Sequence, residues 1–189
     1  MDETQNVDFN FFDIDDIIAK SESTSCTFDG DAFGEDFYEE ILGIGRPKIN
    51  AGGFSVDAPY WLIDSVKTKC RINVSQTYGP TMQSVLTADA KNINLARQEQ
   101  NFFAIGMELC QLLKEEDPDG AYKLSKCLLS TLTQRLGGII AIALHGQNKA
   151  EKLANLEIKV FEKGKKHKQD IDNWLRENSK LKTNKRKLQ

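Results

Sequence analysis

The chain has 189 residues, 40% of them hydrophobic, and a formal net charge of −3 at pH 7. A chain of this length can bury one substantial core, or a small domain beside a larger one. Its slightly acidic balance argues against a generally basic nucleic-acid-binding protein. No apolar run approaches the roughly 18 residues of a membrane-spanning helix, and the acidic start does not resemble a signal peptide, so a soluble, intracellular protein is expected.

The charge is distributed unevenly along the chain. Residues 1–40 contain 13 Asp or Glu and one Lys, whereas residues 145–189 contain 13 Lys or Arg and six Asp or Glu. Such polarity suits docking against charged neighbours. It equally suits two solvated ends that keep the protein soluble, and both interpretations stay open. The Lys185-Arg186-Lys187 run is a weak nuclear-import pattern, which favours the nucleus as the location.

The first forty residues alternate short apolar patches with acidic ones. Residues 9–18 predict one or two turns of amphipathic helix, in which Ile14, Ile17 and Ile18 share a face. The stretches 21–25 and 28–38 contain serines, or glycines among acids, with few apolar residues. We predict a mobile, partly disordered loop there.

Residues 40–75 predict a small β-containing unit. The alternation of apolar and polar residues over 54–58 indicates a half-buried strand, and Pro59 suits the start of a short helix over 60–66. Residues 70–74 alternate again and are predicted to return as a strand. With the acidic start, these elements form a predicted β-rich N-terminal domain of residues 1–76.

Helical periodicity dominates from residue 77 onward and predicts a mainly α-helical second domain of residues 77–189. Helices are expected over 82–86 and 97–116, and from Asp117-Pro118 to a stop at Gly146. Gly137-Gly138 should cost that last helix about 1 kcal/mol each relative to Ala, so either a close helix approach compensates or the helix kinks. Two further helices, around 153–160 and 171–175, are predicted on either side of a basic link over 163–168, before a polar, basic tail.

The sequence contains no recognisable catalytic, cofactor-binding or metal-binding motif. His145 and His167 lack the spacing of zinc ligands, and Gly43-Ile44-Gly45 is followed by Arg46-Pro47, which cannot open a phosphate-binding helix. We therefore expect no catalytic residue, no cofactor and no metal, and a protein that is not an enzyme. The cysteines form no C-x-x-C pair and are interpreted as buried thiols, with Cys-His nucleophilic catalysis left open; they are Cys26, Cys70, Cys110 and Cys127.

The apolar stretches of two predicted helices allow two interpretations. Simple core packing explains them, but their apolar character extends around much of each helix, which a small domain has difficulty covering by itself. Burial against another chain is the alternative. The candidate positions for a shared core or a protein interface are Phe102, Phe103, Leu124, Leu128, Leu132 and Leu136.

Several short segments occur in an order that resembles one known family. They are residues 10–18 with Asp15-Asp16, residues 58–62 (Ala-Pro-Tyr-Trp-Leu), residues 86–95 with Ala88-Asp89, residues 102–106 (Phe-Phe-Ala-Ile-Gly) and residues 171–174. Together they are similar to the Psf-three subunits of the GINS replication complex. Ala90 and Met82 depart from that pattern, where proline and tryptophan are usual. The element at 58–62 also occurs in the Psf-two subunits, so the choice between the two rests on the aspartate motifs.

The resemblance implies a small B-type domain followed by a larger helical A-type domain, and one copy in a heterotetramer with three related subunits. It implies a scaffold that bridges the MCM ring and the Cdc-forty-five protein in the replicative helicase, where MCM hydrolyses ATP. Neither sequence-specific nucleic-acid binding nor a membrane contact is implied. The alternatives are a free-standing helical adaptor whose basic tail contacts nucleic acid, and an enzyme with an unrecognised site.

Overall fold

The computed structural model describes residues 13–28, 33, 37–41, 43, 53–145 and 152–186, with side chains as far as residue 178 except at 38. The described residues divide into two compact units. The first holds those up to 75 together with 107–121, and the second holds 76–106 together with 122–186. Residues 10–12 of the first family motif, the stretch 44–52 and the predicted helix stop at Gly146 lie outside the described residues.

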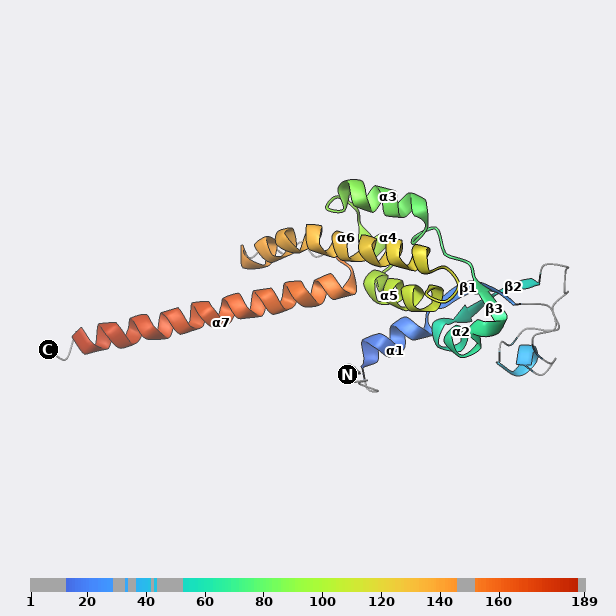
Figure 1. Cartoon of the computed structure of the whole chain (residues 1–189). Coiled ribbons are helices and arrows are strands. Elements are labelled where there is room, and N and C mark those ends of the chain that lie inside the picture. Colours follow the sequence, from blue (N-terminus) through green and yellow to red (C-terminus); the bar gives the residue numbers. More distant parts are fainter. Residues whose placement is uncertain are drawn as a thin grey trace, which may run out of the picture. The chain divides into compact units, whose positions relative to one another are not determined.

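The first unit contains a three-stranded antiparallel sheet with strand order β2-β1-β3 (Figure 1). The predicted strands are present as β2 (Phe54–Pro59) and β3 (Cys70–Ile72). The central strand, β1 (Ser23–Phe28), covers residues for which we predicted a mobile loop, and that prediction was wrong. The residues of β1 alternate between its two faces, and Thr24, Cys26 and Phe28 are buried. Burial in this serine-rich segment therefore alternates with the two-residue period of a strand, which the prediction overlooked.

Two helices and two shorter turns accompany the sheet. The predicted amphipathic helix is α1 (Ile14–Ser21), whose N-terminus is capped by the Asp13 carboxylate accepting from the Asp15 N–H at 3.1 Å. The predicted helix after Pro59 is α2 (Tyr60–Val66), and the 3-10 turn η2 (Lys67–Lys69) leads from it into β3. A π-helical turn, η1 (Phe37–Ile41), lies partly in the predicted loop over 28–38.

Ion pairs join these elements to residues 107–121 of the same unit. Lys20 of α1 pairs with Asp16 at 2.9 Å and lies 3.9 Å from the Glu108 carboxylate, while Lys67 pairs with Glu115 at 3.0 Å. The hydrogen bond to Asp16 is the largest cause that raises the pKa of Lys20. Because these side chains are partly solvated, the pairs orient the elements more than they stabilise them.

The second unit is helical, with α3 (Pro80–Asp89), α4 (Leu95–Gln98), most of α6 (Pro118–Leu144) and α7 (Asn155–Arg186). The predicted single helix over 97–116 was wrong, because the chain turns between α4 and α5 (Phe102–Leu113). Contacts with the start of α7 hold this turn: the Asn155 N–H donates to the Gln100 carbonyl at 2.9 Å, and its side-chain amide donates to Asn101 at 2.8 Å.

The two helices predicted near the C-terminus are one. Helix α7 continues through the basic stretch 163–168, which we had predicted to be a link. Lysines favour helices, and the stretch contains only one glycine. At that glycine, Gly164, an added Cβ would lie 3.2 Å from the Ala143 Cβ of α6, so the two helices pack closely there. Figure 1 shows α7 (orange to red) continuing as one helix toward the C-terminus.

The start of α6 confirms the predicted cap, since the Asp117 carboxylate accepts from the Gly120 N–H at 2.9 Å. The helix continues through Gly137 and Gly138. An added Cβ at either glycine would meet nothing within 4 Å. The close helix approach that we considered for these glycines is therefore absent from the part of the chain that the structure describes. Gly106 of α5 does have such an approach, because its added Cβ would lie 2.8 Å from Leu128.

Candidate interaction surfaces

One face of α6 carries exposed apolar side chains along most of the helix. Tyr122 and Leu129 are both 67% exposed, and Ile140 and Leu144 are exposed as well. Leu136, which lies between them, is half-buried. Steps of seven, seven, four and four residues place all five on one helix face. We call this set the α6 stripe.

The opposite face of α6 packs into the core of the second unit. Leu124 and Leu128 are buried there, as are Phe102 and Phe103 of α5. The Tyr78 ring stacks on Phe102 with 5.1 Å between ring centroids, and its hydroxyl donates to the Phe102 carbonyl at 3.0 Å. Four of the six sequence-predicted positions therefore lie in the core. The remaining two, Leu132 and Leu136, are half-buried, and Leu136 belongs to the α6 stripe.

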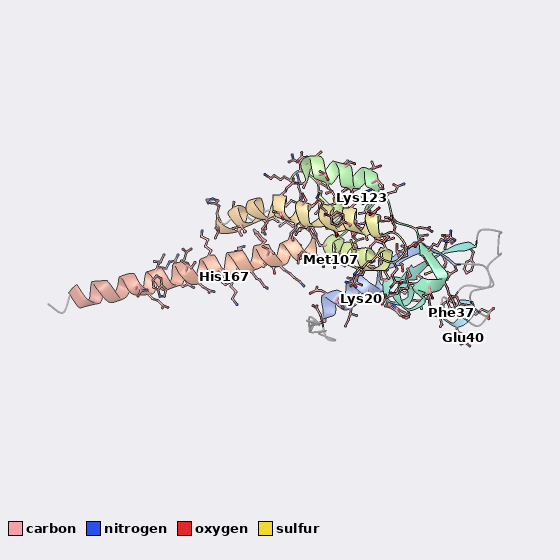
Figure 2. The ribbon with its side chains drawn as sticks, viewed as in Figure 1. Lys20, Phe37, Glu40, Met107, Lys123 and His167 are labelled. Atoms are coloured by element: carbon pink, nitrogen blue, oxygen red, sulfur yellow. The ribbon has the colours of Figure 1, made fainter. Side chains whose placement is uncertain are left out.

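The projecting half of α7 has no buried side chain among residues 162–178. Ile171, Trp174 and Leu175 are 53 to 63% exposed, and their spacing places them on one face. We call these three residues the α7 patch. Figure 2 shows His167 on the same helix, with side chains projecting on both sides of the ribbon. In proteins most of the stability of a helix comes from the packing of an apolar face, and the α7 patch leaves such a face exposed.

A buried ion pair connects α6 to the start of α7. The Arg135 guanidinium donates to both carboxylate oxygens of Glu157, at 2.6 and 2.9 Å. It also donates to the carbonyls of Ala90 and Ile93, at 2.7 Å each, and to that of Lys152 at 3.0 Å. These five bonds use all five N–H groups of the arginine. The pair therefore fixes the turn after α3, the middle of α6 and the entry to α7 against one another.

The Arg135–Glu157 pair was not predicted from the sequence. Glu157 is fully buried, and its second oxygen also accepts from the Ala154 N–H at 3.0 Å. The available signal was a charged residue, Arg135, within an otherwise apolar stretch of α6, because an unpaired charge there would be costly. Its partner lies 22 residues away and could not be identified from spacing alone. The α6 stripe was not predicted either, although the seven-residue step from Tyr122 to Leu129 was visible.

A cavity of about 440 Å³ opens beside this ion pair. Its apolar floor belongs to the cluster formed by Ile139, Ala143, Leu153 and Phe161, against which Ile142 packs. The ammonium-bearing side chains of Lys91 and Lys152, both exposed, stand at its rim. The complete lining is Lys91, Arg135, Gly138, Ile139, Ile142, Lys152 and Leu153. We call this cavity the Gly138 pocket.

The thiols and histidines form no metal site among the described residues, where no group of three His, Cys, Asp or Glu side chains gathers. Cys26, Cys70 and Cys127 are buried as predicted, whereas Cys110 is half-buried. Burial is the largest cause that raises the pKa of Cys26 to about 12. A thiol with such a pKa is a poor nucleophile at neutral pH.

Helix α6 is long and apolar enough to cross a membrane by length and composition alone. This differs from the sequence reading, which found no run of sufficient length. The single charged residue of its C-terminal part, Arg135, is paired inside the helical unit, and one face of α6 packs on α5. We therefore assign α6 to the core of this unit.

Comparison with known proteins agrees with the family resemblance. The family model described as Sld5: GINS complex protein helical bundle domain matches residues 78–176, which include α3 to α6 and the described start of α7. A Dictyostelium discoideum protein, "Probable DNA replication complex GINS protein PSF3", is 28% identical over 173 residues, which are 88% of this chain and 62% of that protein. The Bos taurus "DNA replication complex GINS protein PSF3" is 24% identical over 176 residues, 87% of this chain and 80% of that protein. The chain thus spans under two thirds of the Dictyostelium relative, and it belongs to the GINS complex protein helical bundle family.

Proposed function

We propose that this chain is a non-catalytic structural subunit of a GINS complex, occupying the position of the PSF3 subunit. Both relatives carry the PSF3 name, and the matched family domain is the GINS helical bundle. Residues 1–76 would be its B-type domain and residues 77–189 its A-type domain. In this proposal the chain binds three other GINS subunits in the nucleus, and the assembled complex contacts the MCM ring and the Cdc-forty-five protein to activate the replicative helicase.

The observation that carries the proposal is the pair of apolar surfaces on α6 and α7. Together, the α6 stripe and the α7 patch expose eight positions rich in large aliphatic and aromatic side chains, of which only Leu136 is half-buried. Fully burying a large apolar side chain contributes about 1.5–3 kcal/mol. Because these side chains are already partly buried, each would contribute about 1 kcal/mol to the free energy of assembly. Several such residues at one surface provide the core of a stable interface.

Co-expression with the three candidate partner subunits tests this proposal. The expected result is a stoichiometric four-chain particle, identified by native mass spectrometry. Leu129→Asp and Trp174→Asp should each weaken assembly by about 100-fold or more, since each places a carboxylate in an apolar contact. Both positions are exposed in the chain itself, so its own fold should be unaffected.

Matched controls separate an interface from general charge effects. Lys123→Asp on α6 and Gln169→Asp on α7 introduce the same carboxylate on the same helices, outside the α6 stripe and the α7 patch. Figure 2 shows Lys123 near the start of α6. Assembly should survive both controls. Normal assembly of Leu129→Asp and Trp174→Asp, or failure of the wild-type chain to join any of the three partners, contradicts the proposal.

A further inference from the structure

The Gly138 pocket has features that the α6 stripe and the α7 patch lack. Its floor is apolar and continuous with the buried cluster around Ile139 and Leu153. Its rim carries Lys91 and Lys152, and among the described residues no carboxylate pairs with either of them. The pocket therefore combines an apolar interior with unneutralised positive charge at the opening.

Arg135 adds no free donor to this pocket. All five of its N–H groups are already used by Glu157 and three backbone carbonyls. Its charge is balanced by the buried Glu157 carboxylate. A ligand would consequently be recognised by the apolar floor and by the two lysines, and not by a bidentate contact with arginine.

The second feature of the pocket is the open space beside Gly138. A glycine within a helix costs about 1 kcal/mol relative to alanine. At Gly106 that cost is offset by close packing, because an added Cβ would lie 2.8 Å from Leu128. At Gly138 nothing lies within 4 Å of an added Cβ, so no described part of the chain uses the space. Because Gly138 lines the pocket, a longer side chain at this position would project into unoccupied space there.

We propose that the Gly138 pocket binds a short acidic segment of another protein that inserts one aliphatic side chain between the two rim lysines. The volume of about 440 Å³ has room for a leucine or isoleucine side chain with its adjoining backbone. Acidic residues flanking that side chain would face Lys91 and Lys152, which act mainly on specificity and association rate. This site does not depend on the α6 stripe or on the proposed assembly.

Fluorescence anisotropy of labelled hexapeptides tests the proposal on the full chain, alone and after co-purification with its partners. The probes are Asp-Asp-Ile-Leu-Asp-Glu, Lys-Lys-Ile-Leu-Lys-Lys and Asp-Asp-Ser-Ser-Asp-Glu. Only the first, which is both acidic and aliphatic, should bind. Competition that abolishes its binding in the complex would identify the occupant as a segment of a partner subunit. No saturable binding up to about 1 mM in either form overturns the proposal.

Variants of adjacent residues locate the site. Gly138→Leu fills the pocket and should weaken peptide binding at least tenfold, whereas Gly137→Leu, at the neighbouring glycine that does not line the pocket, should leave it unchanged. Lys91→Gln with Lys152→Gln should weaken binding and flatten its salt dependence, while Lys126→Gln should not. Circular dichroism confirms folding of each variant. Equal binding by Gly138→Leu and Gly137→Leu would also refute the pocket, whatever the outcome of the assembly experiment.

Discussion

The ion pair between Arg135 and Glu157 should be the most sensitive polar contact of the helical unit. Replacing Arg135 by methionine preserves most of the side-chain volume but removes all five hydrogen bonds. Among the described residues, the fully buried Glu157 carboxylate then keeps the Ala154 N–H as its one donor. Breaking a buried pair in this way costs about 3–5 kcal/mol, a large part of the 5–15 kcal/mol that stabilises a typical domain.

A double-mutant cycle separates the loss of the pair from the loss of the other bonds. Arg135→Met/Glu157→Met removes the stranded carboxylate, so it should be more stable than Arg135→Met alone. It should remain less stable than the wild type, because the carbonyls of Ala90, Ile93 and Lys152 lose their donor. Urea denaturation followed by far-UV circular dichroism measures each free energy of unfolding. A loss below about 1 kcal/mol for Arg135→Met, or a double variant less stable than it, would refute this reasoning.

Three further predictions concern positions outside the ion pair. Gly137→Ala should raise the free energy of unfolding by about 0.5–1 kcal/mol, because the added methyl group meets open space; a lower melting temperature would contradict this. Partial burial is the largest cause that raises the pKa of Glu108, so its ionised form destabilises the fold at neutral pH and protonation relieves this as pH falls. Glu108→Gln should therefore be at least as stable as the wild type at pH 7, although it loses the ion pair with Lys20. The difference in the free energy of unfolding between the two proteins should vanish near pH 4. Urea denaturation at both pH values measures this difference. Cys26, with its pKa raised to about 12, should react with iodoacetamide at pH 8 only after unfolding, as peptide mass mapping would reveal.

The elements that the sequence predicted correctly are those with local signals. Pro59 precedes α2, and Asp117 caps α6, because each residue acts on backbone groups within a few positions. The periodicity of α1 and of β2 is likewise local. The family resemblance supplied the architecture, which residue patterns alone described only as a small β-rich part followed by helices.

The failures share a dependence on distant partners. The turn between α4 and α5 is held by Asn155, more than fifty residues later in the chain. The helix propensity of residues 97–116 therefore could not predict this turn. Strand β1 has a serine-rich sequence, and it is a strand because it lies between two others that pair with it. The core and surface faces of α6 both contain leucines; Leu128 is buried beside Gly106 of α5, whereas Leu129 is exposed.

The central position of β1 also determines when the sheet can form during protein synthesis. Its two pairing partners, at residues 54–59 and 70–72, emerge from the ribosome well after it. Until then β1 has neither neighbour, and both of its edges lack hydrogen-bond partners from the sheet. The compact unit is complete only once residues 107–121 have also been made. Translation must therefore have passed residue 121 before the N-terminal sheet has all the contacts of its compact unit.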